Sequence, residues 1–290
     1  MGLLSYLVAS LRGIRSMRQR VLRLSTIAVL SALLPVMAAT PLARAATPAD
    51  AELRAAIAGP QRSPDAVRRD AFRHPVQELE FFGLRPDQTV VEIWPSGGYW
   101  TEILAPVLRA QGTYDLALPP PKPGTDARQA PILRKLAANQ AGYGRVVPTQ
   151  AGPGHFDIAP PGSADLVLTF RNLHNWMEGG YAPQMLAAFH RALKPGGVLG
   201  IEEHRGHREG VQDPKAEDGY VRQDYAIAMI EKAGFKLVAS SEINANPKDT
   251  ANWPQGVWTL PPTLALGAKD RDRYLAIGEA DNFVLKFRKS

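Results

Sequence analysis

One segment constrains the fold of this chain more than any other. It is an apolar stretch at residues 89–94 that runs directly into small, turn-forming residues at 95–98. A short apolar run with a single acid, Glu92, is typical of a strand buried on both faces. A helix is predicted immediately afterwards, over residues 99–110. A strand, a small-residue turn and a helix in this order predict an α/β architecture.

Strands and helices alternate through the rest of the chain. The pattern predicts strands at 113–118, 145–147, 164–170, 198–203, 236–243 and 282–289, and helices at 126–141, 182–193, 221–233 and 269–277. Such alternation requires a mostly parallel sheet with helices on both faces. We therefore expect a helical lead-in at 46–88 and one α/β domain at 89–290 that contains an insertion at 246–266.

The first 45 residues have the composition of a secretory signal peptide. A positively charged stretch precedes an apolar run at 24–39, and the Ala-Arg-Ala sequence at 43–45 offers a cleavage site. The apolar run is shorter than the roughly 20 residues that a membrane span needs. Met17 is a candidate for the true start. We expect an exported protein, periplasmic or secreted, without a stable membrane span after cleavage; an uncleaved anchor is the alternative.

The charge outside this segment is balanced. The chain has 34 basic and 28 acidic residues, and the leader holds six arginines and no acid, so 28 of each sign remain. A neutral domain has no overall field that attracts nucleic acid, and we expect no nucleic-acid partner. The absence of cysteine excludes disulfides, thiolate metal sites and cysteine nucleophiles.

The turn after the first strand is a candidate ligand site. Parallel sheets bind ligands at the C-terminal ends of their strands, where small residues let the backbone approach a nucleotide-like ligand. Compared with an acidic-x-Gly-x-Gly-x-Gly pattern that begins at Glu92, Trp94 and Ser96 replace the first two glycines, and only Gly98 matches. A tight turn that binds nothing is the alternative.

Polar side chains also follow two later strands. Asn172 and His174 come after the strand at 164–170, where Asn172 can hold a ligand and His174 can act as a base. The alternative is that His174 braces a helix. The strand at 198–203 ends in Glu203, followed by His204 and His207. The spacing of these histidines matches no zinc signature, so we assign no metal site and expect a solvated polar loop.

The insertion at 246–266 carries Trp253, Trp258 and a Pro-Pro pair at 261–262. Aromatic residues and prolines in a long insertion suggest a lid over the substrate side of the domain. The alternative is that the tryptophans pack the insertion itself.

Together these segments resemble the class I S-adenosylmethionine (SAM) methyltransferases. The Leu-Lys-Pro-Gly-Gly turn at 193–197 and the Ala-Gly-Phe sequence at 233–235 are recurring marks of that superfamily. More closely, segments spread over nearly all of residues 70–290 are similar to a bacterial family of predicted exported methyltransferases; they lie at 92–106, 168–177, 203–205, 241–249 and 256–262. The resemblance implies a Rossmann-like sheet of seven strands in which the last strand is antiparallel, and SAM as the cofactor.

The resemblance implies methyl transfer to a small molecule or an envelope component outside the cytoplasm. The residues expected to hold the cofactor lie at two strand ends: Glu92, Trp94, Ser96, Gly97, Gly98 and Asn172. The candidates to position or deprotonate the nucleophile are His174, Glu203, His204 and Tyr220.

One departure from the family pattern concerns the ribose of SAM. An acid that ends the second strand binds the ribose hydroxyls in ordinary members, whereas this strand ends in Leu118, with Asp115 inside it. Two alternatives therefore stay open. One is a non-catalytic ligand-binding protein on a degenerate methyltransferase fold. The other is a metal-dependent enzyme that uses His174, His204 and His207.

Overall fold

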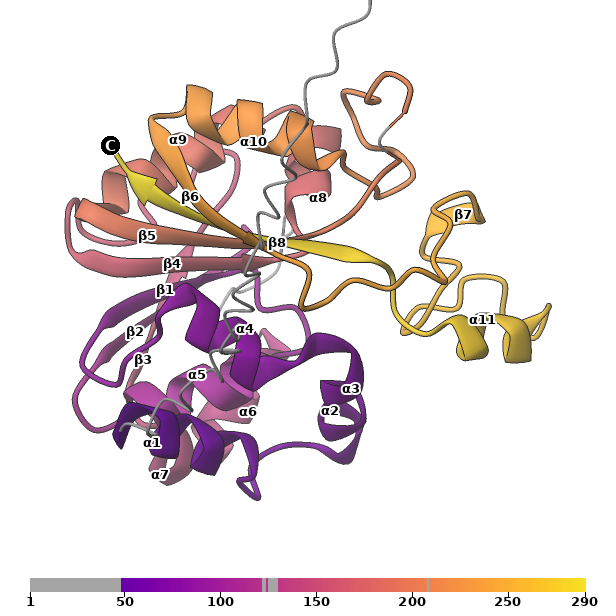
Figure 1. The fold of residues 1–290 in the computed structure, drawn as a ribbon. Coiled ribbons are helices and arrows are strands. Elements are labelled where there is room, and N and C mark those ends of the chain that lie inside the picture. The colour runs from indigo at the N-terminus through magenta and orange to yellow at the C-terminus, as the bar shows by residue number, and fades with distance from the viewer. Residues whose placement is uncertain (1–47, 122–123, 125–129, 208) are drawn as a thin grey trace, which may run out of the picture. The chain divides into compact units, whose positions relative to one another are not determined.

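A seven-stranded sheet forms the centre of the domain (Figure 1). The computed structural model describes residues 48–121, 124, 130–207 and 209–290, so the expected signal peptide and the Met17 start lie outside the described residues. Within these residues, no helix is long and apolar enough to span a membrane.

The strand order is β3-β2-β1-β4-β5-β8-β6. The strands are β1 (Thr89–Ile93), β2 (Thr113–Leu118), β3 (Val146–Gln150), β4 (Ala164–Phe170), β5 (Leu193–His204), β6 (Phe235–Ser241) and β8 (Asn282–Lys289). The pairings β1–β2, β2–β3, β1–β4 and β4–β5 are parallel, and β8 is antiparallel to both β5 and β6. The predicted Rossmann-like sheet, with its antiparallel last strand, is confirmed.

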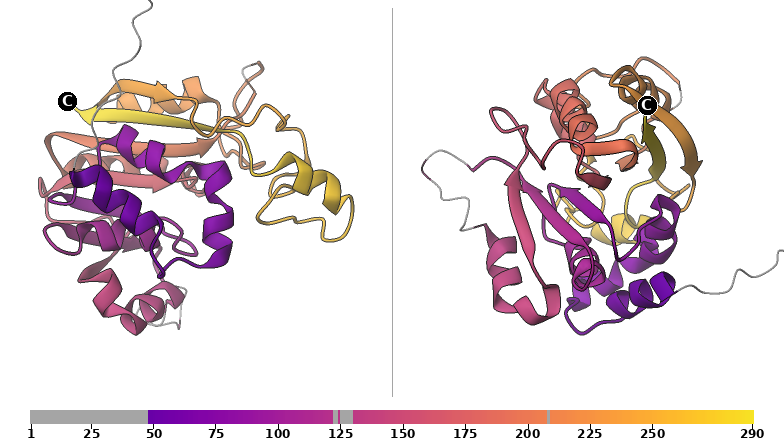
Figure 2. Two further views of the ribbon diagram at one scale, coloured as in Figure 1. Left: turned by 60° about the horizontal axis from the view of Figure 1, so that its bottom comes forward. Right: turned by 90° about the vertical axis from the view of Figure 1, so that its left-hand side faces the viewer.

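Helices cover both faces of the sheet (Figure 2). One face carries α8 (Leu173–Glu178), α9 (Ala182–Ala192) and α10 (Gln223–Lys232). The other carries α1 (Pro48–Ile57), α4 (Pro75–Phe82), α5 (Thr101–Leu108), α6 (Pro131–Ala138) and α7 (Gln140–Tyr143). Each face has its own apolar core, with Trp176 and Phe189 buried in the first and Phe82 and Tyr114 in the second. The middle strands are buried between these cores, which explains their continuous apolar sequences.

The lead-in is helical, and local signals set its helix ends. In α2 (Pro64–Arg68) the Ser63 side chain accepts a hydrogen bond from the Ala66 backbone N–H, and Pro64 occupies the first turn. A further short helix, α3 (Asp70–Arg73), precedes α4. Gly83 ends α4 at φ 84°, a conformation that glycine adopts without steric cost.

The structure differs from the sequence prediction in several boundaries. β5 begins at Leu193 rather than at 198, because Leu193 pairs with Ala164 across an irregularity in the β4–β5 ladder. β3 continues to Gln150, since every residue of β3 pairs with a residue of the neighbouring β2. The helix predicted at 126–141 is two helices, α6 and α7, with residues 125–129 outside the described part.

The insertion has a small apolar core of its own. It contains β7 (Pro254–Val257), which lies outside the main sheet, and leads to α11 (Arg271–Ile277). The buried residues of this third core are Tyr220, Val257, Leu260, Tyr274 and Ala280. In Figure 1 the insertion and α11 project beyond the end of the sheet at which β4 and β5 terminate.

Candidate functional site

A cavity of about 270 Å³ opens at the C-terminal ends of β1 and β4. Its lining includes Glu92 and the turn at 94–97 on the β1 side, and Phe170 and Arg171 on the β4 side. The lead-in contributes Arg69 and Arg73, and the insertion contributes Pro262. The cavity therefore lies where parallel sheets bind ligands, and segments from both ends of the domain enclose it.

The turn after β1 has a left-handed backbone at residues other than glycine. Trp94 and Ser96 both have φ 52°, in the left-handed region that L-residues rarely adopt, and Gly98 has φ 85°. The surroundings of Trp94 help to hold this conformation. Its backbone N–H donates to the Ala117 carbonyl at 2.8 Å, and its indole Nε1–H donates to the Ala151 carbonyl at 2.8 Å. The turn therefore has, at Trp94 and Ser96, the backbone conformation that glycine adopts most readily.

Glu92 is buried beneath the turn. One of its carboxylate oxygens accepts hydrogen bonds from the Thr101 hydroxyl at 2.8 Å and from the Tyr114 hydroxyl. Burial raises the pKa of Glu92 to about 7, although both hydrogen bonds act in the opposite direction. Glu92 therefore joins β1 to α5 and β2 and also lines the cavity.

The end of β2 carries no carboxylate. Leu118 is its last residue, and Asp115 lies inside the strand, paired with Val91 and Val147, where burial raises its pKa. The side-chain amide of Asn172 is hydrogen-bonded within the protein. It donates to the Ile93 carbonyl at 3.1 Å and to the Trp94 carbonyl at 3.4 Å. Asn172 therefore fixes the exit of β4 against the turn after β1.

His174 and Glu203 form a buried pair next to this edge. His174 lies in the first turn of α8, three residues beyond Arg171, and its Nδ1 lies 2.9 Å from Glu203 Oε1. Burial raises the pKa of Glu203, but its electrostatic attraction to His174 and the hydrogen bonds that it accepts from His174 and from the His204 backbone N–H hold this pKa below its usual value. Because an ionised carboxylate only accepts hydrogen bonds, His174 donates from Nδ1 to Glu203, so the neutral form of the ring carries its lone pair on Nε2.

His204 is the second histidine of this cluster. Its ring centroid lies 5.4 Å from that of His174, and its Nδ1 lies 2.8 Å from Asn282 Oδ1. Burial lowers the pKa of His204 to about 3, against the opposing effect of Glu203. His204 is therefore a neutral ring at physiological pH that donates to Asn282 from Nδ1.

The same three residues form a geometric candidate for a metal site. His174, Glu203 and His204 offer ligand atoms that all lie within 4.8 Å of one another. His207, which the sequence analysis considered for this role, is exposed and does not belong to the group. Glu203 already accepts three hydrogen bonds, two from His174 and one from the His204 backbone N–H.

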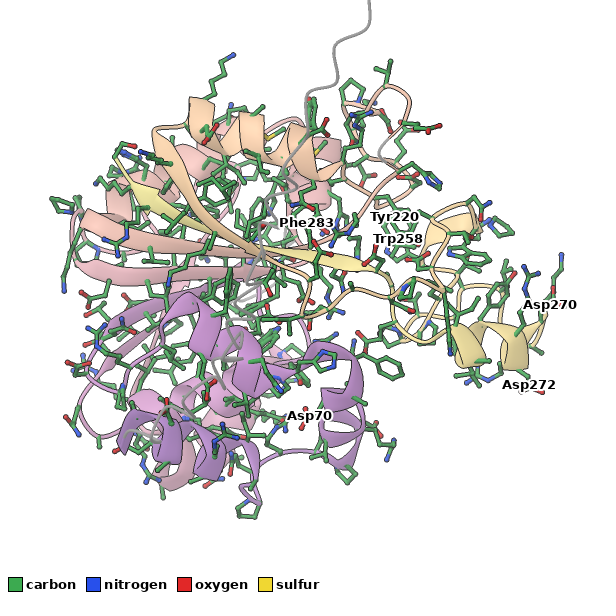
Figure 3. The ribbon with its side chains drawn as sticks, in the orientation of Figure 1. Asp70, Tyr220, Trp258, Asp270, Asp272 and Phe283 are labelled. Atoms are coloured by element: carbon green, nitrogen blue, oxygen red, sulfur yellow. The ribbon has the colours of Figure 1, made fainter. Side chains whose placement is uncertain are left out.

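The insertion is fastened to the domain through Asp249. Tyr220 donates its hydroxyl to this carboxylate at 3.0 Å, and Trp253 donates its indole Nε1–H at 2.7 Å. The Trp258 ring lies 6.0 Å from that of His174. Figure 3 shows Tyr220 and Trp258 near each other where the insertion leaves the sheet. Burial and the Asp249 charge raise the pKa of Tyr220, so its hydroxyl stays protonated.

The cavity wall contains an arginine cluster that the sequence does not predict. Arg69, Arg73 and Arg171 line the cavity and all form ion pairs with Glu279. Arg69 and Arg73 lie one helical turn apart in the lead-in, which was the only local sign of a shared face. Their partner lies more than 200 residues further along the chain, so no local pattern indicated the cluster.

Comparisons with known proteins place the fold but not the reaction. No family model and no curated protein matches the chain. A SAM-dependent methyltransferase from Aquifex aeolicus has a similar structure, with a TM-score of 0.52 and 13% identity over 83% of this chain and 98% of that one. A putative sarcosine dimethylglycine methyltransferase from Galdieria sulphuraria gives 0.50 and 14%, over 77% and 85% of the two chains.

The [4+2]-cyclase SpnF also has a similar structure, with a TM-score of 0.51 and 17% identity over 76% of this chain and 80% of SpnF. This domain therefore has the fold of the class I SAM-dependent methyltransferases. Because a cyclase is among the similar structures, the reaction has to be argued from the site itself.

Proposed function

We propose that this chain is a SAM-dependent methyltransferase that acts outside the cytoplasm on a small molecule or an envelope component. The observation that carries the proposal is the cavity over the turn at 94–97, in a domain with the methyltransferase fold. Strand ends of this kind are where open α/β sheets bind their ligands.

The turn fits the amino-acid end of SAM. Gly97 lines the cavity, and a Cβ atom at this position would meet no atom within 4 Å, so a ligand can approach the backbone closely. Trp94 and Ser96 hold the backbone in the conformation that glycines adopt in such turns. Leu118 offers no acceptor to the ribose hydroxyls, so the affinity for SAM should be lower than a β2 carboxylate would give.

The His174–Glu203 pair suits proton removal from the acceptor. When bound, SAM supplies an electrophilic methyl group on its sulfonium sulfur, and methyl transfer depends mainly on alignment. His174 is buried and lies outside the cavity lining, three residues beyond Arg171, so in this proposal the acceptor extends past Arg171 to reach it. Its Nε2 then takes the acceptor proton, while Glu203 fixes the ring through Nδ1 and stabilises the imidazolium. This assignment favours an acceptor atom that carries a proton, such as a hydroxyl oxygen.

Calorimetric titration of the mature chain, residues 46–290, with SAM and S-adenosylhomocysteine tests the proposal. We expect heat of binding and a higher melting temperature, both reduced in Gly97→Ala, whose new methyl group would project into the cavity. No heat and no thermal shift at millimolar ligand would overturn the proposal. Copurification of a different ligand would then favour the non-catalytic binding protein.

Export is part of the proposal and is supported by the signal-type sequence at 1–45. We expect the mature protein to be released from the periplasm by osmotic shock and to begin at Ala46. A protein that keeps residues 1–45 and stays in the membrane fraction would contradict this part of the proposal.

A metal-dependent enzyme is a second candidate, because His174, Glu203 and His204 place their ligand atoms close together. Two histidines and a glutamate are the zinc donors of several hydrolases. The three hydrogen bonds to Glu203 favour an orienting role for this carboxylate instead. Stoichiometric zinc that is lost in His204→Ala would support the metal-dependent enzyme, and full methyl transfer by metal-free protein would exclude it.

A further inference from the structure

Three arginines share one carboxylate in the cavity wall. Arg69 donates to the Glu279 carboxylate from Nε at 2.5 Å and from Nη2 at 3.1 Å. Arg73 donates to it from Nε at 3.1 Å, and Arg171 from Nη1 at 2.7 Å. Glu279 is 3% exposed and Arg73 is 2% exposed, so solvent screens these charges poorly. Glu279 is the only carboxylate with which all three guanidinium groups pair in the described part of the chain.

The other carboxylates near the cavity have partners of their own. Glu92 is bonded to Thr101 and Tyr114, Glu102 pairs with Lys135, and Asp65 pairs with Arg68. Glu202 lies 3.8 Å from Arg171 and accepts a hydrogen bond from Asn244, and the charge of Glu203 also acts on Arg171. Arg69 and Arg73 therefore depend on the single Glu279 carboxylate, which they share with Arg171, for their ion pairs in the described part of the chain.

Arg73 carries the clearest sign of a missing partner. Its Nη2 is buried and has no hydrogen-bond acceptor, although the side chain lines the cavity. Its guanidinium carbon lies 4.4 Å from the centre of the Tyr99 ring, and this aromatic face supports the positive group. A buried guanidinium donor without an acceptor is unfavourable, so a ligand that supplies the acceptor gains affinity.

We propose that Arg69, Arg73 and Arg171 form a subsite for a carboxylate or phosphate group of the methyl acceptor. The fork of a guanidinium group matches the planar oxygens of such anions. This inference rests on the proposed methyltransferase function, because it assigns the substrate class of the same cavity.

The charge of the cofactor favours the acceptor as the source of the anion. The amino-acid end of SAM is a zwitterion, and the sulfonium adds a positive charge, so SAM brings no net negative charge to the three arginines. An anionic acceptor offsets both the arginines and the sulfonium. The lining also contains the stacked rings of Trp100 and Phe170, whose centroids lie 4.2 Å apart. These rings suit an acceptor molecule whose remaining part is apolar or aromatic.

The test measures binding of inorganic phosphate and of S-adenosylhomocysteine to the mature chain by calorimetry, without any turnover. The variants are Arg73→Gln and Arg69→Gln, and the matched control is Arg54→Gln, an exposed lead-in arginine that pairs with Glu80 outside the cavity lining. Arg69 is partly exposed, so its variant keeps the test decisive if Arg73→Gln does not fold. We expect both variants to weaken phosphate binding by about ten- to a hundredfold and to change S-adenosylhomocysteine affinity by less than about threefold.

Two results would overturn the proposal. In the first, phosphate does not bind, or binds equally to parent and variants. In the second, the variants weaken S-adenosylhomocysteine but not 5′-methylthioadenosine, which lacks the amino-acid end; the arginines then hold the carboxylate of the cofactor. If phosphate binds through the arginines while no adenosyl ligand binds, the anion subsite stands and the methyltransferase proposal fails.

Discussion

His174 and Glu203 are joined by two hydrogen bonds, one from the imidazole Nδ1 at 2.9 Å and one from the His174 backbone N–H at 3.2 Å. Both bonds are buried, and together they fix the position of α8 and the orientation of the ring. An imidazole held in this way by a carboxylate presents Nε2 as a base.

We expect His174→Gln to lower kcat by about a hundredfold or more, because it removes the base while leaving the cavity wall in place. The affinity for S-adenosylhomocysteine should stay the same. His155→Gln is the control, since His155 is an exposed histidine in the loop between β3 and β4. Parental kcat in His174→Gln would show that His174 does not take the proton.

Alanine substitutions at Gly97 and Gly98, neighbours in the turn, should affect stability and ligand binding differently. Alanine at Gly98 should cost about 1–3 kcal/mol of unfolding free energy, because φ is 85° and the new Cβ would lie 2.5 Å from Ile132 Cδ1. Alanine at Gly97 has open space and should leave stability nearly unchanged while weakening ligand binding. Urea unfolding and calorimetry of both variants measure the two effects. Equal loss of stability in both would contradict the geometry of the turn.

Glu92 should make the protein less stable as the pH rises. Its pKa is about 7 when folded and 4.5 ordinarily, so the folded state holds a proton that the unfolded chain releases. The linkage predicts a loss of about 3 kcal/mol between pH 4.5 and pH 7, and no further loss from this group above that range. In urea unfolding at pH 5 and pH 8, Glu92→Gln should remove most of this difference. Exposed Glu52→Gln is the control, and an unchanged pH dependence in Glu92→Gln would refute the prediction.

Asp249 should stabilise the folded conformation of the insertion. It accepts hydrogen bonds from Tyr220 and Trp253 and from the backbone N–H groups of Ala251 and Asp281. Asp249→Ala should lower the unfolding free energy by at least about 2 kcal/mol and speed proteolysis within 246–266, since several donors lose their acceptor. Asp272→Asn, on the outer side of α11 in Figure 3, is the control and should behave like the parent.

Much of the sheet could be predicted from local sequence. The strands at 113–118, 164–170 and 282–289 have the predicted bounds, because runs of apolar residues between turn signals define a strand that is buried on both faces. The start of β5 at Leu193 could not be predicted, because it depends on a ladder contact with Ala164. α8 is not predicted as a helix from its own residues, because a segment of six residues is too short to show a helical apolar period.

The α/β class, the strand ends that carry polar residues and the presence of Trp94 and Ser96 in the turn follow from local sequence. The left-handed backbone of the turn depends on tertiary contacts, since the acceptors of the two Trp94 hydrogen bonds lie in β2 and directly after β3. The tertiary structure also brought Arg69 and Arg73 to Glu279. These contacts depend on how the lead-in and the segment after α11 pack at the end of the sheet. The free energy of burying the charges together therefore cannot be predicted from any one segment of the chain.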